Sequence, residues 1–103
     1  MQQLAVQFVR YVDASFPGWV ACEFVDAEGR RQAIIDRVPI ATSEPLEATS
    51  VYPQPGSVAR EELKRWQDTD GRELVRISTE PFGFESTEGL SEFTVPATLL
   101  TSA

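Results

Sequence analysis

Residues 56–81 read GSVAREELKRWQDTDGRELVRISTEP, and this stretch decides the fold of the chain. Two charged segments with scattered aromatic and aliphatic residues meet at Asp68-Thr69-Asp70-Gly71. An Asp-Gly pair between two such segments is typical of a β-hairpin, because glycine adopts the positive φ that the turn requires. Pro81 ends the second arm, since proline has no N–H to donate to a ladder. The sequence therefore predicts a hairpin over about residues 57–80.

The first arm of this hairpin, residues 58–67, also fits a helix. Ala59, Leu63 and Trp66 have helical spacing, and Ser57 before them is a residue type that caps helices. The Asp-Gly exit favours a strand. The sequence alone leaves both readings open, with the strand preferred.

An earlier segment, residues 18–38, repeats the same plan around the turn Asp26-Ala27-Glu28-Gly29. Four residues recur at identical spacing, and the matched pairs are Gly29 and Gly71, Arg30 and Arg72, Ile35 and Ile77, and Pro39 and Pro81. Duplication and ordinary hairpin sequence preferences both explain this match. We therefore expect two similar hairpins, at about 18–38 and 57–80.

The flanking segments add strands and loops. Residues 4–13 fit either period, but their β-branched and aromatic side chains favour a strand. Residues 39–56 contain four prolines and form a Pro-rich connection, with a polyproline-like segment at 52–56. Residues 97–103 are expected to be a frayed tail.

These elements together predict an all-β or mainly β protein. We expect a small antiparallel barrel or sandwich of five to seven strands, formed by residues 1–103 as a single β domain. A length of 103 residues is enough to bury one hydrophobic core.

The net charge of −7 is unevenly distributed along the chain. Residues 80–103 contain Glu80, Glu85, Glu88 and Glu92 and no basic residue. Such a field repels phosphate backbones and anionic lipids, so we expect neither a nucleic-acid nor a membrane partner. The acidity suits a basic protein partner, and it equally suits simple solubility.

The cellular compartment is predicted from what the sequence lacks. A single cysteine permits no internal disulfide, and no apolar run approaches the roughly 18 residues of a membrane span. The N-terminus has no signal-peptide pattern. We therefore expect a cytoplasmic protein.

The sequence offers little catalytic chemistry, because it contains no histidine as a base or a zinc ligand. Cys22 lies in an apolar strand, where cysteine usually packs as a small hydrophobe. The carboxylates considered for acid–base work are Asp36, Glu23 and the group formed by Glu85, Glu88 and Glu92. Asp68 begins a calcium-like loop, but Thr79 stands where the twelfth-position Glu is required. No catalytic residue, metal or cofactor is predicted, although an enzyme using carboxylates or Cys22 stays an alternative.

The only concentration of basic and aromatic residues lies in the second hairpin. It consists of Arg60, Lys64, Arg65, Arg72, Arg76 and Trp66. On a β-barrel these residues would suit single-stranded nucleic acid, a second alternative. Neighbouring carboxylates cancel their charge, which favours a solvated hairpin instead.

Aromatic residues near turns and prolines, together with carboxylates after them, are the candidate partner-binding residues. They are Phe16, Trp19, Tyr52, Phe82, Phe84, Glu85, Glu88 and Glu92. The alternative is that the aromatic residues belong to the core. The leading hypothesis is a non-catalytic, acidic protein-interaction module that acts as an inhibitor, a regulator or a self-associating subunit, with a protein partner or a second copy bound.

Overall fold

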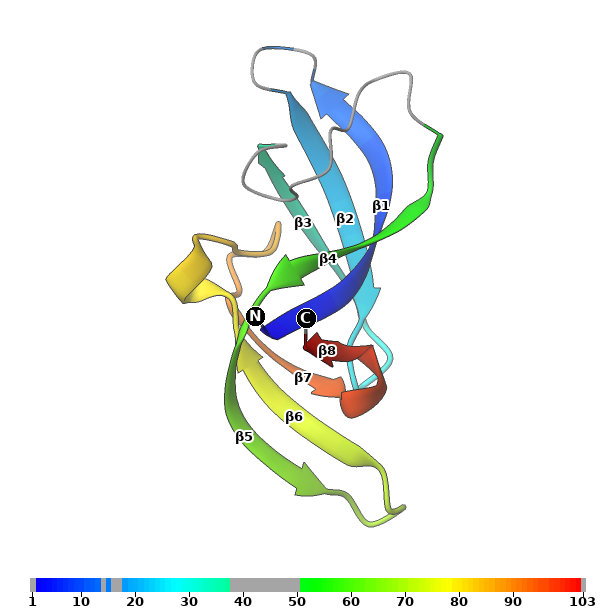
Figure 1. The fold of residues 1–103 in the computed structure, drawn as a ribbon, viewed down its shortest axis with the longest axis vertical. Helices are drawn as coiled ribbons and strands as arrows, with labels where there is room; N and C mark the ends of the chain where they lie inside the picture. Colours follow the sequence, from blue (N-terminus) through cyan, green and yellow to red (C-terminus); the bar gives the residue numbers. More distant parts are fainter. Residues whose placement is uncertain (1, 14, 16–17, 38–50, 103) are drawn as a thin grey trace.

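A computed structural model describes residues 2–13, 15, 18–37 and 51–102 (Figure 1). Within these residues the strands are β1 (Gln2–Asp13), β2 (Trp19–Val25), β3 (Arg31–Arg37), β4 (Gln54–Ala59), β5 (Glu61–Gln67), β6 (Glu73–Ser78), β7 (Glu92–Pro96) and β8 (Leu100–Ser102), and two short 3-10 helices are η1 (Glu80–Phe82) and η2 (Ala97–Leu99). None of the described residues forms an α-helix. The mainly β class is confirmed, with eight strands where five to seven were expected.

The strands form two antiparallel sheets. Sheet A has the order β3-β2-β1-β4, with β8 also paired to β1, and sheet B has the order β5-β6-β7. The ladders among the described strands do not close into a barrel. Buried side chains from both sheets form a single hydrophobic core.

The chain passes from sheet A to sheet B at Arg60. β4 ends at Ala59 and β5 begins at Glu61, so the segment 58–67 is extended and the helix reading is wrong. Ala59 belongs to β4 of sheet A, whereas Leu63 and Trp66 belong to β5 of sheet B, so their helix-like spacing does not reflect a shared element. The arm of the second hairpin therefore starts at Glu61, not at residue 57.

The first hairpin is built by β2 and β3 around a turn that Asp26 organises. The backbone N–H of Gly29 donates to the Asp26 carbonyl at 3.0 Å, and the Asp26 N–H donates to the Arg30 carbonyl at 2.8 Å. The Asp26 carboxylate accepts from the N–H groups of Glu28 and Arg30. Gly29 has φ +80°, which its missing Cβ permits.

The second hairpin, β5 and β6, repeats each of these bonds. Gly71 N–H donates to the Asp68 carbonyl at 3.0 Å, and Asp68 N–H to the Arg72 carbonyl at 2.9 Å. The Asp68 carboxylate accepts from the N–H groups of Asp70 and Arg72. The prediction of two hairpins with one turn design is therefore confirmed.

A third turn of this design occurs where only a loop was expected. Gly89 N–H donates to the Ser86 carbonyl at 2.8 Å, and Ser86 N–H donates to the Leu90 carbonyl at 2.7 Å. The Ser86 hydroxyl replaces the aspartate carboxylate and accepts from the N–H groups of Glu88 and Leu90. The sequence signal was a small polar residue three positions before a glycine.

The Pro-rich connection is shorter than expected at its C-terminal end. Most of it, residues 38–50, lies outside the described residues, but Gln54–Ala59 pairs with β1 as β4 instead of forming a polyproline segment. A Cβ on Gly56 would overlap the ring of Phe8. Gly56 therefore allows the Phe8 ring to pack flat on the β4 backbone.

The C-terminal segment differs from the expected frayed tail. Residues 97–99 form η2, and β8 pairs with the start of β1, with Leu100 opposite Leu4. Leu99 and Leu100 pack against the core. Burial of these two apolar side chains and the ladder to β1 give the segment a fixed position that sequence periodicity over so few residues did not reveal.

Two irregularities in β1 change which side chains face the core. Leu4, Val6 and Phe8 are buried in alternation as expected. Register shifts relative to β2 then occur between Phe8 and Arg10 and again after Tyr11. An extra residue in one strand reverses the alternation, so Tyr11 packs against the core and Val12, which continues the spacing of Leu4, Val6 and Phe8, is 38% exposed.

Candidate functional site

The predicted aromatic residues occupy different environments. Phe84 is buried in the core, whereas Phe82 is 39% exposed on η1. Trp19 is half-buried, with the Arg37 guanidinium 6.0 Å from the ring centroid, and Tyr52 packs partly against the core. Phe16 lies outside the described residues. Figure 1 places the start of β2, η1 and the segment before β4 at three separate parts of the molecule.

The predicted carboxylates Glu85, Glu88 and Glu92 are all exposed. Glu92 forms an ion pair with Arg76 at 3.5 Å. Glu88 belongs to the Ser86 turn through its backbone N–H. They lie on the segment from η1 to β7, beside the exposed Phe82.

Arg60 was expected on a solvated hairpin, with a nucleic-acid face as the alternative, but it is a buried structural cation with 3% exposure. Its Nε donates to the Gln3 carbonyl at 3.1 Å, and its Nη2 donates to the Thr101 carbonyl at 3.4 Å. Its Nη1 donates to the Gln2 side chain at 3.3 Å and lies 3.7 Å from a Glu62 oxygen. Burial lowers the pKa of Arg60, an effect that Glu62 opposes. One side chain thus joins β1, β8 and the bend between the sheets.

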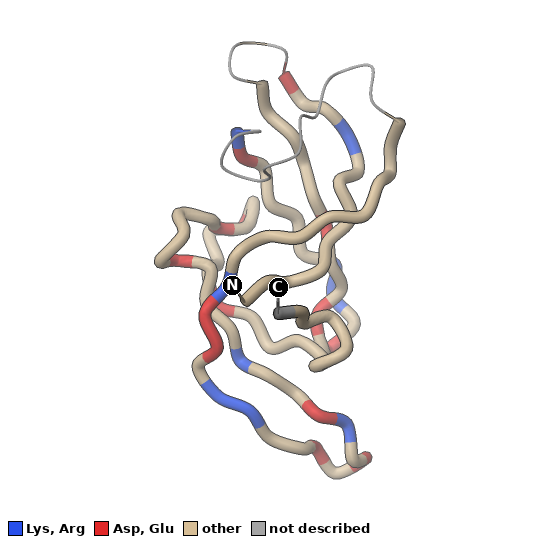
Figure 2. Tube along the Cα trace, in the orientation of Figure 1, with Lys and Arg blue, Asp and Glu red and all other residues tan. Residues whose placement is uncertain are grey.

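The other basic residues of the second hairpin are also engaged within the chain. Arg65 contacts Glu62 and Glu73 at 2.6 Å each, and Arg72 contacts Asp68 at 3.0 Å. These carboxylates raise the pKa of Arg65. The Lys64 ammonium lies 5.5 Å from the Trp66 ring centroid. Figure 2 shows the alternating signs of charge along this hairpin.

Cys22 and Asp36 are two of the residues on which the enzyme alternative depends. Cys22 is 2% exposed, and burial, with the Asp36 charge as a smaller cause, raises the pKa of its thiol to about 12. The thiol is therefore protonated at neutral pH, a poor nucleophile. Asp36 pairs with its neighbour Arg37 at 3.7 Å at the end of β3.

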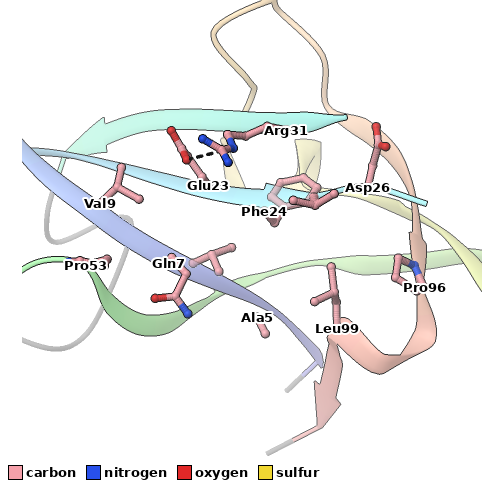
Figure 3. A pocket seen from close by; sticks show the side chains of 12 residues that line it. Ala5, Gln7, Val9, Glu23, Phe24, Asp26, Arg31, Pro53, Pro96 and Leu99 are labelled. Atoms are coloured by element: carbon pink, nitrogen blue, oxygen red, sulfur yellow. Dashed lines mark ion pairs between the residues drawn. The ribbon is translucent and has the colours of Figure 1, made fainter. Parts of the chain in front are cut away.

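The described residues form a groove on the outer face of sheet A (Figure 3). Its volume is about 600 Å³. The floor comes from Ala5, Gln7 and Val9 of β1, whose side chains point away from the core face of that strand. The sequence analysis did not predict this groove. It singled out aromatic residues, whereas the side chains that β1 contributes to the floor are not aromatic.

The walls of the groove come from segments far apart in the chain. Val25 of β2 lies at the groove with 49% exposure, and Leu99 of η2 and Pro96 of β7 stand at one end. Pro53, before β4, lies at the other end in Figure 3. Only the folded C-terminal segment completes the groove, so no local sequence signal could have identified it.

At the groove, one edge of β1 has a gap in its ladder of backbone pairing. On one edge, β1 pairs with β8 up to Leu4 and with β2 from Gln7 onward. Among the described strands, no ladder partner lies on this edge for Ala5 and Val6, although both pair with β4 on the other edge. In an antiparallel strand successive residues direct their N–H and C=O groups to opposite edges. One of these two residues therefore points its backbone groups toward the gap.

The charged groups of the groove lie on one side. Glu23 of β2 forms an ion pair with Arg31 of β3 at 3.6 Å. Asp26 lies in the turn after β2. Its carboxylate accepts hydrogen bonds from the Glu28 N–H of that turn and from the Gln32 side-chain amide, the latter at 3.0 Å. Along β1 the groove is thus apolar except for Gln7, and it carries two carboxylates and one guanidinium along β2, the turn after β2 and β3.

Other kinds of site are not seen in the described part of the chain. No three His, Cys, Asp or Glu side chains there come together as metal ligands. No helix within it has the length and apolar character to cross a membrane. No protein-family model, curated protein or solved structure matches the chain.

Proposed function

We propose that this chain is a non-catalytic protein-interaction module and that its binding surface is the groove over β1 and β2. In this proposal the two sheets act as a small sandwich, a scaffold that holds the groove, in a cytoplasmic protein. The occupant is an extended segment of a partner protein with alternating apolar and basic side chains. The open, mainly apolar groove with carboxylates on one side is the single observation that carries the proposal.

The shape and chemistry of the groove fit an extended segment. Apolar side chains of the segment would cover Ala5, Val9 and Leu99, which are only partly buried. The gap in the β1 ladder leaves the N–H and C=O groups of one residue, Ala5 or Val6, available for a hydrogen bond with a bound peptide. Glu23 and Asp26 outnumber the single guanidinium of Arg31, which pairs with Glu23, so the groove keeps an excess of negative charge. A net charge of −7 also steers a basic partner toward the protein.

The enzyme alternative has less support, because Cys22 is buried and protonated at neutral pH. The nucleic-acid alternative also has less support. Arg60, Arg65 and Arg72 all bond to groups within the chain, which leaves few cations for phosphates.

The test is a titration of isotope-labelled protein with a ten-residue peptide of alternating Val and Lys, followed by amide chemical shifts. We expect the largest shifts at Ala5, Gln7 and the residues of β2 that line the groove. A matched peptide with Glu in place of Lys is the control, and it should bind at least about tenfold more weakly. Absence of shifts at the groove with the Val-Lys peptide at millimolar concentration would overturn the proposal.

A pair of matched variants localises the binding. Val25→Arg places a bulky cation in the groove and should abolish the shifts at Ala5 and Gln7. Val12→Arg changes a similarly exposed valine of sheet A that does not line the groove and should leave binding unchanged. Equal loss in both variants would show that general charge, not the groove, drives binding.

A further inference from the structure

A second surface, unrelated to the groove, lies on β5, the edge strand of sheet B. Sheet B has the order β5-β6-β7, so β5 has a ladder partner on one edge only among the described strands. Figure 1 shows the β5–β6 hairpin projecting from the body of the molecule, with β5 on its outer side. Every residue of β5 is exposed except Trp66, which is half-buried. An exposed edge presents unpaired N–H and C=O groups to any strand that can dock on it.

The order of charges along β5 makes the strand complementary to a second, antiparallel copy of itself. The strand begins with Glu61 and Glu62, continues with Leu63, and then carries Lys64 and Arg65. When two copies run antiparallel with Leu63 near the centre, the acidic half of each strand faces the basic half of the other. Cross-strand pairs of opposite charge stabilise antiparallel ladders, whereas like pairs destabilise them.

Two of these charges have no ion-pair partner among the residues that the structure describes. Arg65 is held by Glu62 and Glu73, but Glu61 and Lys64 form no ion pair in the described part of the chain. A neighbouring β5 would provide carboxylates near Lys64 and cations near Glu61. Edge charges usually prevent sheet-to-sheet association, but here the four charges sum to zero and repulsion arises only in the parallel orientation.

Leu63 supplies an apolar centre for the contact. It is 45% exposed and falls at a register shift, where it has no opposite residue in the ladder with β6. When two such exposed apolar side chains pack against each other, the burial of their surface lowers the free energy of the pair. A two-fold axis near Leu63 brings the leucines of two copies together.

We propose that a second copy of this chain docks on β5, so that two β5 strands pair antiparallel about a two-fold axis near Leu63. The two copies of sheet B then form one continuous six-stranded sheet. Such an interface is isologous, since the same patch serves both subunits, and it closes as a dimer. The backbone ladder supplies affinity, and the opposed charges fix orientation and register.

Charge-reversed variants test this interface in solution by sedimentation equilibrium. E61K/E62K makes the strand wholly basic at these positions, and K64E/R65E makes it wholly acidic. Each variant alone should have a dimer dissociation constant at least about tenfold higher than that of the parent. An equimolar mixture should form a heterodimer, because the basic strand of one variant faces the acidic strand of the other. Recovery on mixing also shows that both variants are folded.

A matched leucine pair provides an independent test. Leu63→Glu should weaken dimerisation at least about tenfold, whereas Leu90→Glu, at a loop leucine of nearly equal exposure, should not. A parent protein that stays monomeric at millimolar concentration would overturn the proposal. So would a dimer that survives both charge reversals. A dimer lost in Val25→Arg and kept in Leu63→Glu would place the contact at the groove instead.

Discussion

The two hairpins share one turn and differ in almost everything else. In β2, Val20, Cys22 and Phe24 are buried in the core, whereas in β5 only Trp66 is even half-buried. The β2–β3 hairpin is joined to the rest of sheet A through β2, which pairs with β1, and the Ala27 N–H of its turn donates to the Thr94 carbonyl of β7 at 2.9 Å. The β5–β6 hairpin projects outward (Figure 1). Turn chemistry therefore determines that a hairpin forms, and the apolar pattern of its arms determines where it packs.

The largest expected effect comes from removing the core contribution of the first hairpin. Phe24 is 5% exposed and packs edge to face on Phe93 at 5.1 Å between ring centroids. Phe24→Ala should lower the free energy of unfolding by about 3–5 kcal/mol. Trp66→Ala, at the half-buried aromatic residue of the second hairpin, should have less than half that effect. Urea titration of both variants measures the difference, and equal losses would contradict the unequal roles of the hairpins.

The second prediction concerns Arg60, where the chain leaves sheet A for the second hairpin. Arg60→Met keeps much of the side-chain volume but leaves the carbonyls of Gln3 and Thr101 without this donor. We expect a loss of about 2 kcal/mol in the free energy of unfolding, because oxygens of Gln2, Gln3 and Thr101 lose a charged hydrogen-bond donor. Arg65→Met removes a cation exposed on the hairpin and should have a far smaller effect. Similar denaturation midpoints for Arg60→Met and the parent would contradict the structural role of Arg60.

The third prediction compares the two matched turns. Asp26→Ala removes hydrogen bonds to the turn and to Gln32, so we expect a loss of about 1 kcal/mol in the free energy of unfolding. Asp68→Ala removes the corresponding turn bonds from the projecting hairpin. Its effect should appear as faster amide exchange near Gly71, with little change in global stability. Thermal unfolding and hydrogen exchange together separate these outcomes, and a global loss in Asp68→Ala would show that both hairpins unfold as one unit.

The smallest expected effect is the pH dependence of the Asp26 turn. Burial acts to raise the pKa of Asp26, but hydrogen bonds from Gln32 and the N–H groups of Arg30 and Glu28 outweigh it and lower that pKa. A lowered folded-state pKa contributes stability above the ordinary pKa, and that contribution is lost as pH falls through the folded value. The stability difference between the parent and Asp26→Ala should therefore shrink between pH 5 and acid. A constant difference would mean that the charged carboxylate is not the stabilising form.

Sequence reasoning succeeded where the determinants are local. The two Asp-x-x-Gly turns follow from residues a few positions apart, and both turns are as predicted. It failed at Arg60, because a buried cation bonded to Gln3 and Thr101 has the same sequence appearance as a cation on a surface hairpin. The exposure of Val12 was likewise not readable from the alternation of Leu4, Val6 and Phe8, because the shifts in register with β2 leave no mark in the sequence of β1.

By itself, the sequence determined the strand content and the two hairpins, since a glycine at a positive φ and a period-two apolar pattern act over a few residues. Tertiary structure alone decided that β8 pairs with β1, that Arg60 divides residues 54–67 between two sheets, and that a groove opens beside Ala5. These features arise from contacts between residues distant in the chain. Their positions depend on how the two sheets share one core, and no local pattern encodes that arrangement.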